Sequence, residues 1–135
     1  MQIIINQYKT FTDERGEIKT ILSNMKFSSV LKIVTEKGFK RANHYHVDDK
    51  HFTYLICGKL RYIQRPLGSY EKPSEYILLP GQSIYTPNVY EHQFIALERS
   101  IMDCYCYLNR DQESYESDTV RLNFDLSEVL DNWKN

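Results

Sequence analysis

The stretch that decides the fold is residues 38–58, which read GFKRANHYHVDDKHFTYLICG. It begins and ends with glycine and holds three histidines, spaced two and then five residues apart. A second stretch, residues 81–96, reads GQSIYTPNVYEHQFIA and holds one more. Together the two stretches contain every histidine of the chain: His44, His46, His51 and His92. Neutral imidazole is a versatile ligand for Zn, Cu, Fe and Ni, so this concentration of histidine predicts a metal site.

Length and composition narrow the class of protein. With 135 residues, of which 41% are hydrophobic, the chain predicts one ordinary globular domain. The net charge is −1 and there is no basic run, which argues against nucleic acid or an anionic membrane as a partner. No apolar run approaches the ~20 residues of a membrane-spanning helix. Three cysteines, an odd number, and an N-terminus without a charged leader predict free thiols in the cytoplasm.

Short β-favouring segments separated by turn residues predict an all-β sandwich or barrel. We expect one domain over 1–135, with the core barrel at about 28–108, N-terminal strands at 2–22, and a C-terminal tail and helix at 109–135. The helix is expected after the acidic cap Asp125 and packs on the outside of the strands. The expected strands are Ile3–Tyr8, Glu17–Leu22, Ser29–Thr35, Arg41–His46, Phe52–Ile56, Lys59–Gln64, Glu75–Leu79, Ser83–Thr86, His92–Ala96 and Ile101–Leu108.

Strand geometry explains how the histidines can meet. Residues two apart on a strand point to the same face, about 6.6 Å apart at Cα, so His44 and His46 can aim at one point. The turn at Val47–Lys50 reverses the chain and lets His51 open the next antiparallel strand. His92 must arrive from a strand remote in sequence, which a closed barrel allows.

The spacing of both stretches resembles the two motifs of the cupin superfamily, G-x(5)-H-x-H-x(3,4)-E-x(6)-G and G-x(5)-P-x-G-x(2)-H-x(3)-N. The resemblance implies a cupin double-stranded β-helix, which is a jelly-roll barrel, with a divalent transition metal (Zn, Fe, Mn or Ni) on the four histidines. A cupin-like barrel whose histidines act without metal is the alternative. Three residues depart from the motifs: His51 replaces glutamate, Val89 replaces glycine and Ala96 replaces asparagine.

Three further segments are similar to cupins of sugar-nucleotide metabolism. Residues 11–16 read FTDERG and resemble F-x-D-x-R-G of dTDP-4-dehydrorhamnose 3,5-epimerases and capsular-polysaccharide cupins. Residues 41–46 read RANHYH and resemble R-G-x-H-x-H of dTDP-sugar 3,4-ketoisomerases, which usually work without a metal. The tail at 116–121, ESDTVR, is the third segment. The resemblance implies a homodimer that isomerises or epimerises a nucleotide-linked keto sugar for surface polysaccharide.

His51 in the glutamate position changes the charge of the predicted site. Four neutral imidazoles leave the +2 charge of a metal uncompensated, and a unit charge at ~4 Å is worth on the order of 4 kcal/mol at an effective dielectric of 20. We therefore expect a preference for anionic ligands, and polarisation of a keto group that stabilises an enediolate.

Several residues are candidates for chemistry and binding. His44 or His46 can be the general base if no metal binds, and Tyr90 shares strand parity with His92. Two arginines offer a planar fork for phosphate or carboxylate, although surface ion pairs explain them equally well. Two tyrosines offer rings that stack on a substrate. These four substrate-binding candidates are Arg15, Arg41, Tyr45 and Tyr54.

Other interpretations of the same residues remain open. An Fe(II)-dependent dioxygenase would use open positions on the metal, and a non-catalytic sugar-binding or structural cupin would hold the metal closed. Cys104 and Cys106 share a strand face, and either form a softer metal site or pack as small core residues. The run Ile3–Ile5 predicts pairing across the two-fold axis of a homodimer.

Overall fold

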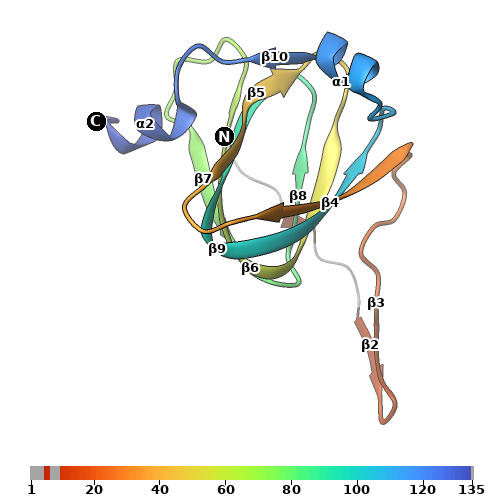
Figure 1. Ribbon diagram of the computed structural model, residues 1–135. Coiled ribbons are helices and arrows are strands. Elements are labelled where there is room, and N and C mark those ends of the chain that lie inside the picture. Colours follow the sequence, from red (N-terminus) through yellow and green to blue (C-terminus); the bar gives the residue numbers. More distant parts are fainter. Residues whose placement is uncertain (1–4, 7–9, 135) are drawn as a thin grey trace.

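The computed structural model describes residues 5–6 and 10–134. Within these residues it contains ten strands, all paired antiparallel, and two short helices (Figure 1), so the all-β prediction is confirmed. The elements are β1 (Ile5–Asn6), β2 (Thr10–Asp13), β3 (Gly16–Lys19), β4 (Ser29–Thr35), β5 (Lys40–His46), β6 (His51–Pro66), β7 (Ser74–Leu78), β8 (Ser83–Thr86), β9 (Tyr90–Cys106), α1 (Gln112–Asp118), β10 (Thr119–Arg121) and α2 (Leu126–Asp131).

Two long strands, β6 and β9, pair with each other along their length and connect the two halves of the barrel. On one side, β8 pairs with the first part of β6 and β4 with the last part of β9. On the other side, β7 pairs with the last part of β6 and β5 with the first part of β9. Because His51 and His92 are in contact, both ends of the long strands lie at one end of the barrel. Their middle parts lie at the opposite end.

The sequence predicts separate strands on either side of Cys57-Gly58, and this prediction is wrong. Gly58 has a φ of +97°, and the pairing of β6 with β9 shifts register around it. A glycine in this conformation makes a bulge instead of a hairpin turn, so the strand bends and continues into the second half of the barrel. In the same way, β9 joins the two strands expected at 92–96 and 101–108.

The apolar core fills the part of the interior away from the histidines. A smaller apolar cluster lies outside the barrel, where Leu126 and Leu130 of α2 cover Ile63 and Ile95. The helix begins directly after its cap Asp125, so the predicted outer C-terminal helix is confirmed. The buried residues of the main core are Leu55, Leu60, Tyr62, Leu78, Ile84, Phe94, Ala96 and Met102.

Three elements of the structure are absent from the sequence prediction: β2, α1 and β10. α1 is short and polar, and it begins after Asp111, whose carboxylate accepts the Ser114 N–H at 2.9 Å. It has no apolar stripe, so periodicity does not mark it. The hairpin of β2 and β3 projects from the end of the barrel away from α1 (Figure 1). Its cross-strand pair Phe11 and Ile18 is 58% and 72% exposed.

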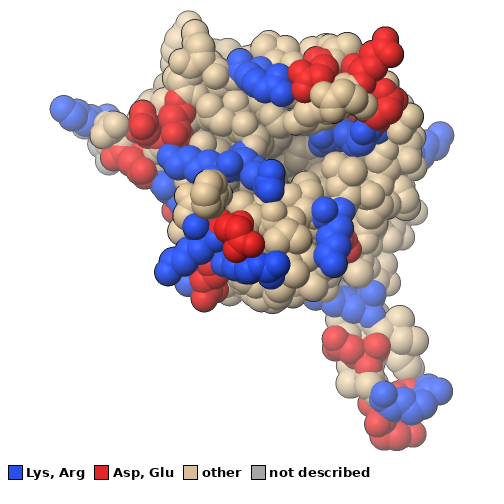
Figure 2. Space-filling view, in the orientation of Figure 1, with Lys and Arg blue, Asp and Glu red and all other residues tan. Residues whose placement is uncertain are grey.

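The predicted first strand, Ile3–Tyr8, falls mostly outside the described residues. Ile5 and Asn6 form β1, which pairs with β8 of the same chain, whereas Ile3 and Ile4 are not described. Lysine and arginine side chains are interspersed with acidic ones on the face shown in Figure 2. In the described ranges, no helix is both long and apolar enough to cross a membrane.

Candidate functional site

Four histidines meet at the end of the barrel that lies next to α1. β5 contributes His44 and His46, β6 begins with His51, and β9 brings His92 opposite His44. Donor atoms of His44, His46 and His92 all lie within 4.8 Å of one another. His51 approaches from one side, with its Nε2 3.3 Å from the Nε2 of His92. The structure thus brings the four rings together, although only three share a common centre.

A bulge in β5 sets the direction of the segment that carries His44 and His46. The pairing of β5 with β9 shifts register between Ala42 and His44. Ala42 and Asn43 have φ values of 69° and 60°, a conformation that is uncommon for residues other than glycine. The Asn43 amide donates to the Phe124 carbonyl at 2.6 Å, and its oxygen accepts the Leu126 N–H at 2.9 Å. The segment before α2 therefore holds the histidine strand in this bend.

All four rings are buried, and none is more than 7% exposed. Burial lowers the pKa of each ring, to about 2 for His44, about 3 for His46 and about 4 for His92. The pKa of His51 is lowered in the same direction by burial, with further contributions from the charges of neighbouring histidines and of Arg110. All four histidines are therefore neutral at pH 7, which is the state that a metal ligand or a general base requires.

Hydrogen bonds assign the tautomers of two rings. Nδ1 of His92 lies 2.9 Å from the Tyr90 carbonyl, which can only accept, so Nδ1 carries the proton. Nδ1 of His46 lies 3.2 Å from Thr119 Oγ1, whose own proton goes to the Tyr115 carbonyl at 2.6 Å. His46 Nδ1 therefore donates too, and both Nε2 atoms carry a lone pair. The Nε2 of His46 is buried and has no hydrogen-bond partner among the described residues.

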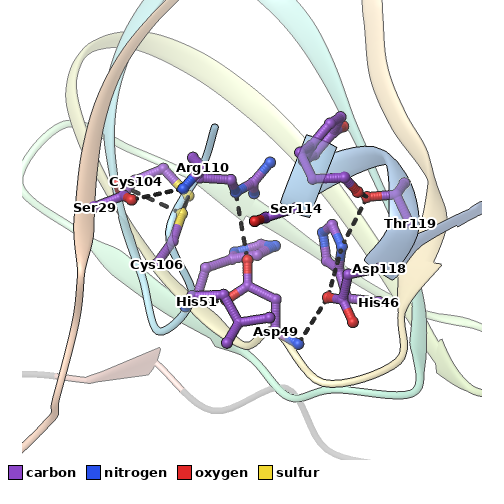
Figure 3. Close-up of polar contacts among 12 residues, drawn as sticks. Ser29, His46, Asp49, His51, Cys104, Cys106, Arg110, Ser114, Asp118 and Thr119 are labelled. Carbon is purple, nitrogen blue, oxygen red and sulfur yellow. Dashed lines mark hydrogen bonds and ion pairs between the residues drawn. The ribbon is translucent and has the colours of Figure 1, made fainter. Parts of the chain in front are cut away.

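Asp118 stands behind His46 (Figure 3). Its Oδ2 lies 3.8 Å from His46 Nδ1, and the carboxylate accepts the N–H groups of Asp48 and Asp49 at 2.8 and 2.9 Å. A carboxylate at Nδ1 stabilises an imidazole that takes up a proton at Nε2. The same arrangement also orients a ring whose Nε2 binds a metal. Both chemistries are therefore open to His46.

The segment of α1 covers the histidines. The Tyr115 ring lies 6.3 and 6.0 Å from those of His44 and His46, centroid to centroid. The Arg110 guanidinium in turn lies 4.5 Å from the centre of the Tyr115 ring. α1 therefore leaves the histidine rings almost closed off from solvent.

The two cysteines of β9 line the same interior. Cys104 and Cys106 are buried, with their Sγ atoms 3.6 Å apart, and Cys106 lies opposite His51 across the strands. Among the described residues, the group of three or more donors close enough for one ion consists of His44, His46 and His92. This favours the interpretation of the cysteines as small core residues.

Two of the three predicted tyrosines, Tyr45 and Tyr54, point away from the rings. Tyr90 lies near enough to the buried Tyr62 to contribute, after burial, to the raised pKa of its hydroxyl. Tyr90 begins β9 and meets His92 through its backbone carbonyl. Tyr45 alternates with the two histidines of β5, so its side chain points to the opposite face. Tyr54 lies on the outer face of β6, where the Lys19 ammonium is 5.6 Å from its ring centre.

The predicted arginines also lie away from the histidines of their own chain. Arg41 donates to the Thr35 hydroxyl and the Val34 carbonyl, each at 2.8 Å, at the end of β4. Arg15 pairs with Asp13 at 2.6 Å inside the projecting hairpin, and its side chain is 81% exposed. The surface-ion-pair interpretation therefore describes Arg15, and Arg41 fastens β5 to β4.

Sequence reasoning did not select the residues that surround the rings. These residues all come after β9 in the sequence, in a polar tail without the regular spacing of apolar residues that marks a helix or strand. One signal was available, because the tail segment 116–121 is the third point of resemblance to sugar-nucleotide cupins. The residues concerned are Arg110, Tyr115, Asp118 and Thr119.

Neither a family model nor a curated protein sequence matches this chain. Solved structures do match. A sugar 3,4-ketoisomerase from Thermoanaerobacterium thermosaccharolyticum, in complex with TDP, has a TM-score of 0.74 and 14% identity, covering 98% of this chain and 97% of that one. A 3,4-ketoisomerase from Helicobacter canadensis has a TM-score of 0.75 and 14% identity, covering 98% and 99%.

A third similar structure is a dTDP-4-dehydrorhamnose 3,5-epimerase from Sulfolobus tokodaii. Its TM-score is 0.76 and its identity 18%, covering 92% of this chain and 78% of that one. The predicted resemblance to ketoisomerases and epimerases of this type is confirmed at the level of structure. At these identities the likeness establishes the fold, which is the predicted jelly-roll barrel of the cupin type.

Proposed function

We propose that this protein isomerises or epimerises a nucleotide-linked keto sugar. The observation that carries the proposal is the Nε2 lone pair of His46, which is buried, unpartnered among the described residues and backed by Asp118. A base so placed can remove a proton from the carbon beside a keto group. Structures of the same fold include a ketoisomerase bound to TDP and an epimerase bound to dTDP-4-keto-L-rhamnose, which supports a nucleotide sugar as the substrate.

The proposed reaction consists of balanced proton transfers. His46 Nε2 takes the proton from the carbon beside the keto group, the C–H electrons form a carbon–carbon double bond, and the keto oxygen gains the negative charge. Return of the proton to the opposite face of the same carbon inverts that centre. If the neighbouring hydroxyl passes its proton to the former keto oxygen and His46 returns its proton to the former keto carbon, the keto group moves by one position. Fixed positive charge near the oxygens lowers the barrier.

Proton exchange tests this proposal directly. The protein is incubated in D₂O with dTDP- and UDP-linked 4-keto sugars, and NMR follows deuterium uptake and product. We expect His46→Asn to slow the exchange at least 100-fold, since positioned bases contribute about 10²–10⁴. Tyr70→Phe, at a side chain that is 94% exposed, is the control and keeps the wild-type rate. No exchange with any of these sugars would overturn the proposal.

We further propose that the histidines bind a divalent transition metal: Zn, Fe, Mn or Ni. Two nitrogens on one tetrahedral zinc ion lie about 3.3 Å apart, given bonds of about 2.0–2.1 Å. The two Nε2 atoms of His51 and His92 have this separation, and donor atoms of His44, His46 and His92 converge. A bound metal would polarise a keto oxygen as a Lewis acid. The His46 lone pair can serve either metal or proton, so metal-loaded protein needs another base.

Elemental analysis of protein purified without a His-tag separates these roles. About one metal per chain, lost in His92→Ala, would support the metal site, and metal-free protein with full exchange activity would assign His46 as the base. Oxygen uptake that requires iron would instead favour the dioxygenase. The charge of the site is tested separately by His51→Glu. This variant should retain the metal and bind anions more weakly, because it restores one negative charge. An unchanged affinity for anions would contradict the predicted effect of the missing charge.

The proposal also includes the oligomeric state of the protein and its cellular compartment. A homodimer is supported by the exposed pair Phe11 and Ile18 on the projecting hairpin, since an isolated hairpin is marginally stable in water. Light scattering tests it, and a mass of 16.1 kDa in solution would contradict it. The three cysteines are free, which supports the predicted reducing, cytoplasmic compartment.

A further inference from the structure

Arg110 directs a positive charge into the histidine end of the barrel. It follows β9 and precedes α1, and its backbone N–H donates to the Ser29 hydroxyl at 2.8 Å (Figure 3). Its side chain is only 13% exposed. The guanidinium carbon lies 4.5 Å from the centre of the Tyr115 ring, so the group lies between α1 and the interior of the barrel.

The guanidinium is poorly satisfied where it lies. Its Nε is 3.3 Å from Asp49 Oδ2, but the nitrogen is buried without a well-aligned hydrogen bond in the described part of the chain. The other oxygen of Asp49 is occupied, because Oδ1 accepts the N–H groups of Lys50 and Leu108 at 3.0 and 2.9 Å. The side chain also hydrogen-bonds the Cys106 thiol. Of the five N–H donors of a guanidinium, the Nε–H is therefore the one that is buried without a well-aligned acceptor in the described part of the chain.

The same charge faces all four histidines. Arg110 contributes, after burial, to the lowered pKa of His44, His46, His51 and His92. These rings are neutral, and Asp118 is already engaged by backbone N–H groups. The interior therefore holds a buried cation whose partners are the Asp49 carboxylate at 3.3 Å and the Cys106 thiol, beside a cluster of neutral rings. The guanidinium can pair with an anion that enters beside the rings, in competition with the Asp49 carboxylate.

We propose that Arg110 is an oxyanion-binding residue at the histidine end of the barrel, and that it holds a planar group with two oxygens. A carboxylate and a cis-enediolate share this shape, and both match the guanidinium fork. A carboxylate would come from a sugar acid, whereas an enediolate forms only during the reaction of a keto sugar. The second source rests on the proposed function, and the first does not.

Glucuronate and glucose are the probes, because they differ by one carboxylate. Calorimetry at constant ionic strength measures Kd for as-purified protein of known metal content. We expect the wild type to bind glucuronate and not glucose, Arg110→Gln to bind glucuronate at least 10-fold more weakly, and Arg110→Lys to lie between. Asp49→Asn should bind more tightly, since it removes the competing carboxylate and keeps Oδ1. The matched control Arg99→Gln, at a side chain that is 57% exposed, should bind like the wild type.

Several results would overturn the inference: no binding of glucuronate, equal binding of glucose, or an unchanged Kd in folded Arg110→Gln and Arg110→Lys. Kinetics with a 4-keto sugar nucleotide separates the two sources. Arg110→Lys should lower kcat at nearly constant KM if the anion is the enediolate, and should raise KM if the substrate carries a carboxylate. Turnover of keto sugars with Arg110-independent anion binding would overturn this inference alone. Arg110-dependent anion binding without any turnover would overturn only the proposed function.

Discussion

The two ends of the barrel interior are built from the same two strands and have opposite character. At one end, Leu55 of β6 packs with Phe94 and Met102 of β9, and each is at most 5% exposed. At the other end, the same strands present histidines, cysteines and Gln64. Two ring nitrogens and Arg110 Nε are buried there without a hydrogen-bond partner among the described residues.

Within β6 and β9, one part of each strand therefore contributes to stability and another part to the candidate site. The side chains of the apolar end are buried against one another, whereas buried polar atoms without partners cost free energy at the histidine end. Such atoms are retained where a ligand supplies the missing bonds, which is why the unsatisfied end is the candidate site. The contrast predicts that the two ends respond differently to acid and to substitution.

Acid should destabilise the histidine end most. Burial holds the pKa of His46 at about 3 and that of His92 at about 4, whereas the ordinary value is 6.5. The unfolded chain therefore binds more protons below pH 6.5, so stability is complete above that pH and falls as the pH drops toward the folded values. We expect a loss of about 2 kcal/mol for each histidine between pH 7 and pH 5.

Urea unfolding of metal-free protein at several pH values measures this loss. His92→Gln removes one such group, so its stability should fall less steeply between pH 7 and pH 5. If the slope of the variant equals that of the wild type, His92 is not held neutral by burial. In that case the histidine end would be more open to water than the contrast implies.

Truncation of the apolar end should have the next largest effect. Leu55 is fully buried, and Leu55→Ala should lower the free energy of unfolding by about 2–5 kcal/mol, through lost burial and the cavity that remains. Leu97→Ala, at a residue that is 37% exposed, is the control, with about 0.5 kcal/mol or less. Folded Leu55→Ala should still bind anions at the histidine end with wild-type Kd. A changed Kd would show that the two ends are coupled.

The bend that allows one strand to serve both ends depends on Gly58. Gly58→Ala should cost about 2–4 kcal/mol, as backbone strain at φ +97° adds to overlap with Ser100 Cα, 2.6 Å from the new Cβ. Gly38 has a similar φ of +89° with nothing within 4 Å, so Gly38→Ala isolates the strain, about 1 kcal/mol. If the two variants are equally stable to heat, the close approach of Ser100 does not require glycine at position 58.

The sequence was sufficient for the fold and the histidines because local patterns specify them. Two-residue spacing on β5 and the glycine–histidine motifs fix which side chains face inward. It was not sufficient for Gly58, because a glycine with positive φ marks a hairpin turn and a bulge equally well. Arg110 and Asp118 were missed because their partners Asp49 and His46 lie more than fifty residues away in the sequence, and a polar tail has no periodicity that reports such contacts.

Tyr62 lies at the boundary between the two ends, and its substitution should have the smallest effect. Its ring belongs to the apolar core, while its hydroxyl donates to Gln64 Oε1 at 2.6 Å and lies 2.6 Å from Thr86 Oγ1. Tyr62→Phe keeps the packing and leaves these two polar groups without that partner, so we expect a loss of about 1–2 kcal/mol in urea unfolding. Tyr76→Phe, whose hydroxyl meets Gln82 at 3.3 Å and is only partly buried, should lose less. If both variants lose equally little, water or a rearranged Gln64 replaces the bond. Water would then reach further into the barrel than the 1–7% exposure of the four histidines indicates.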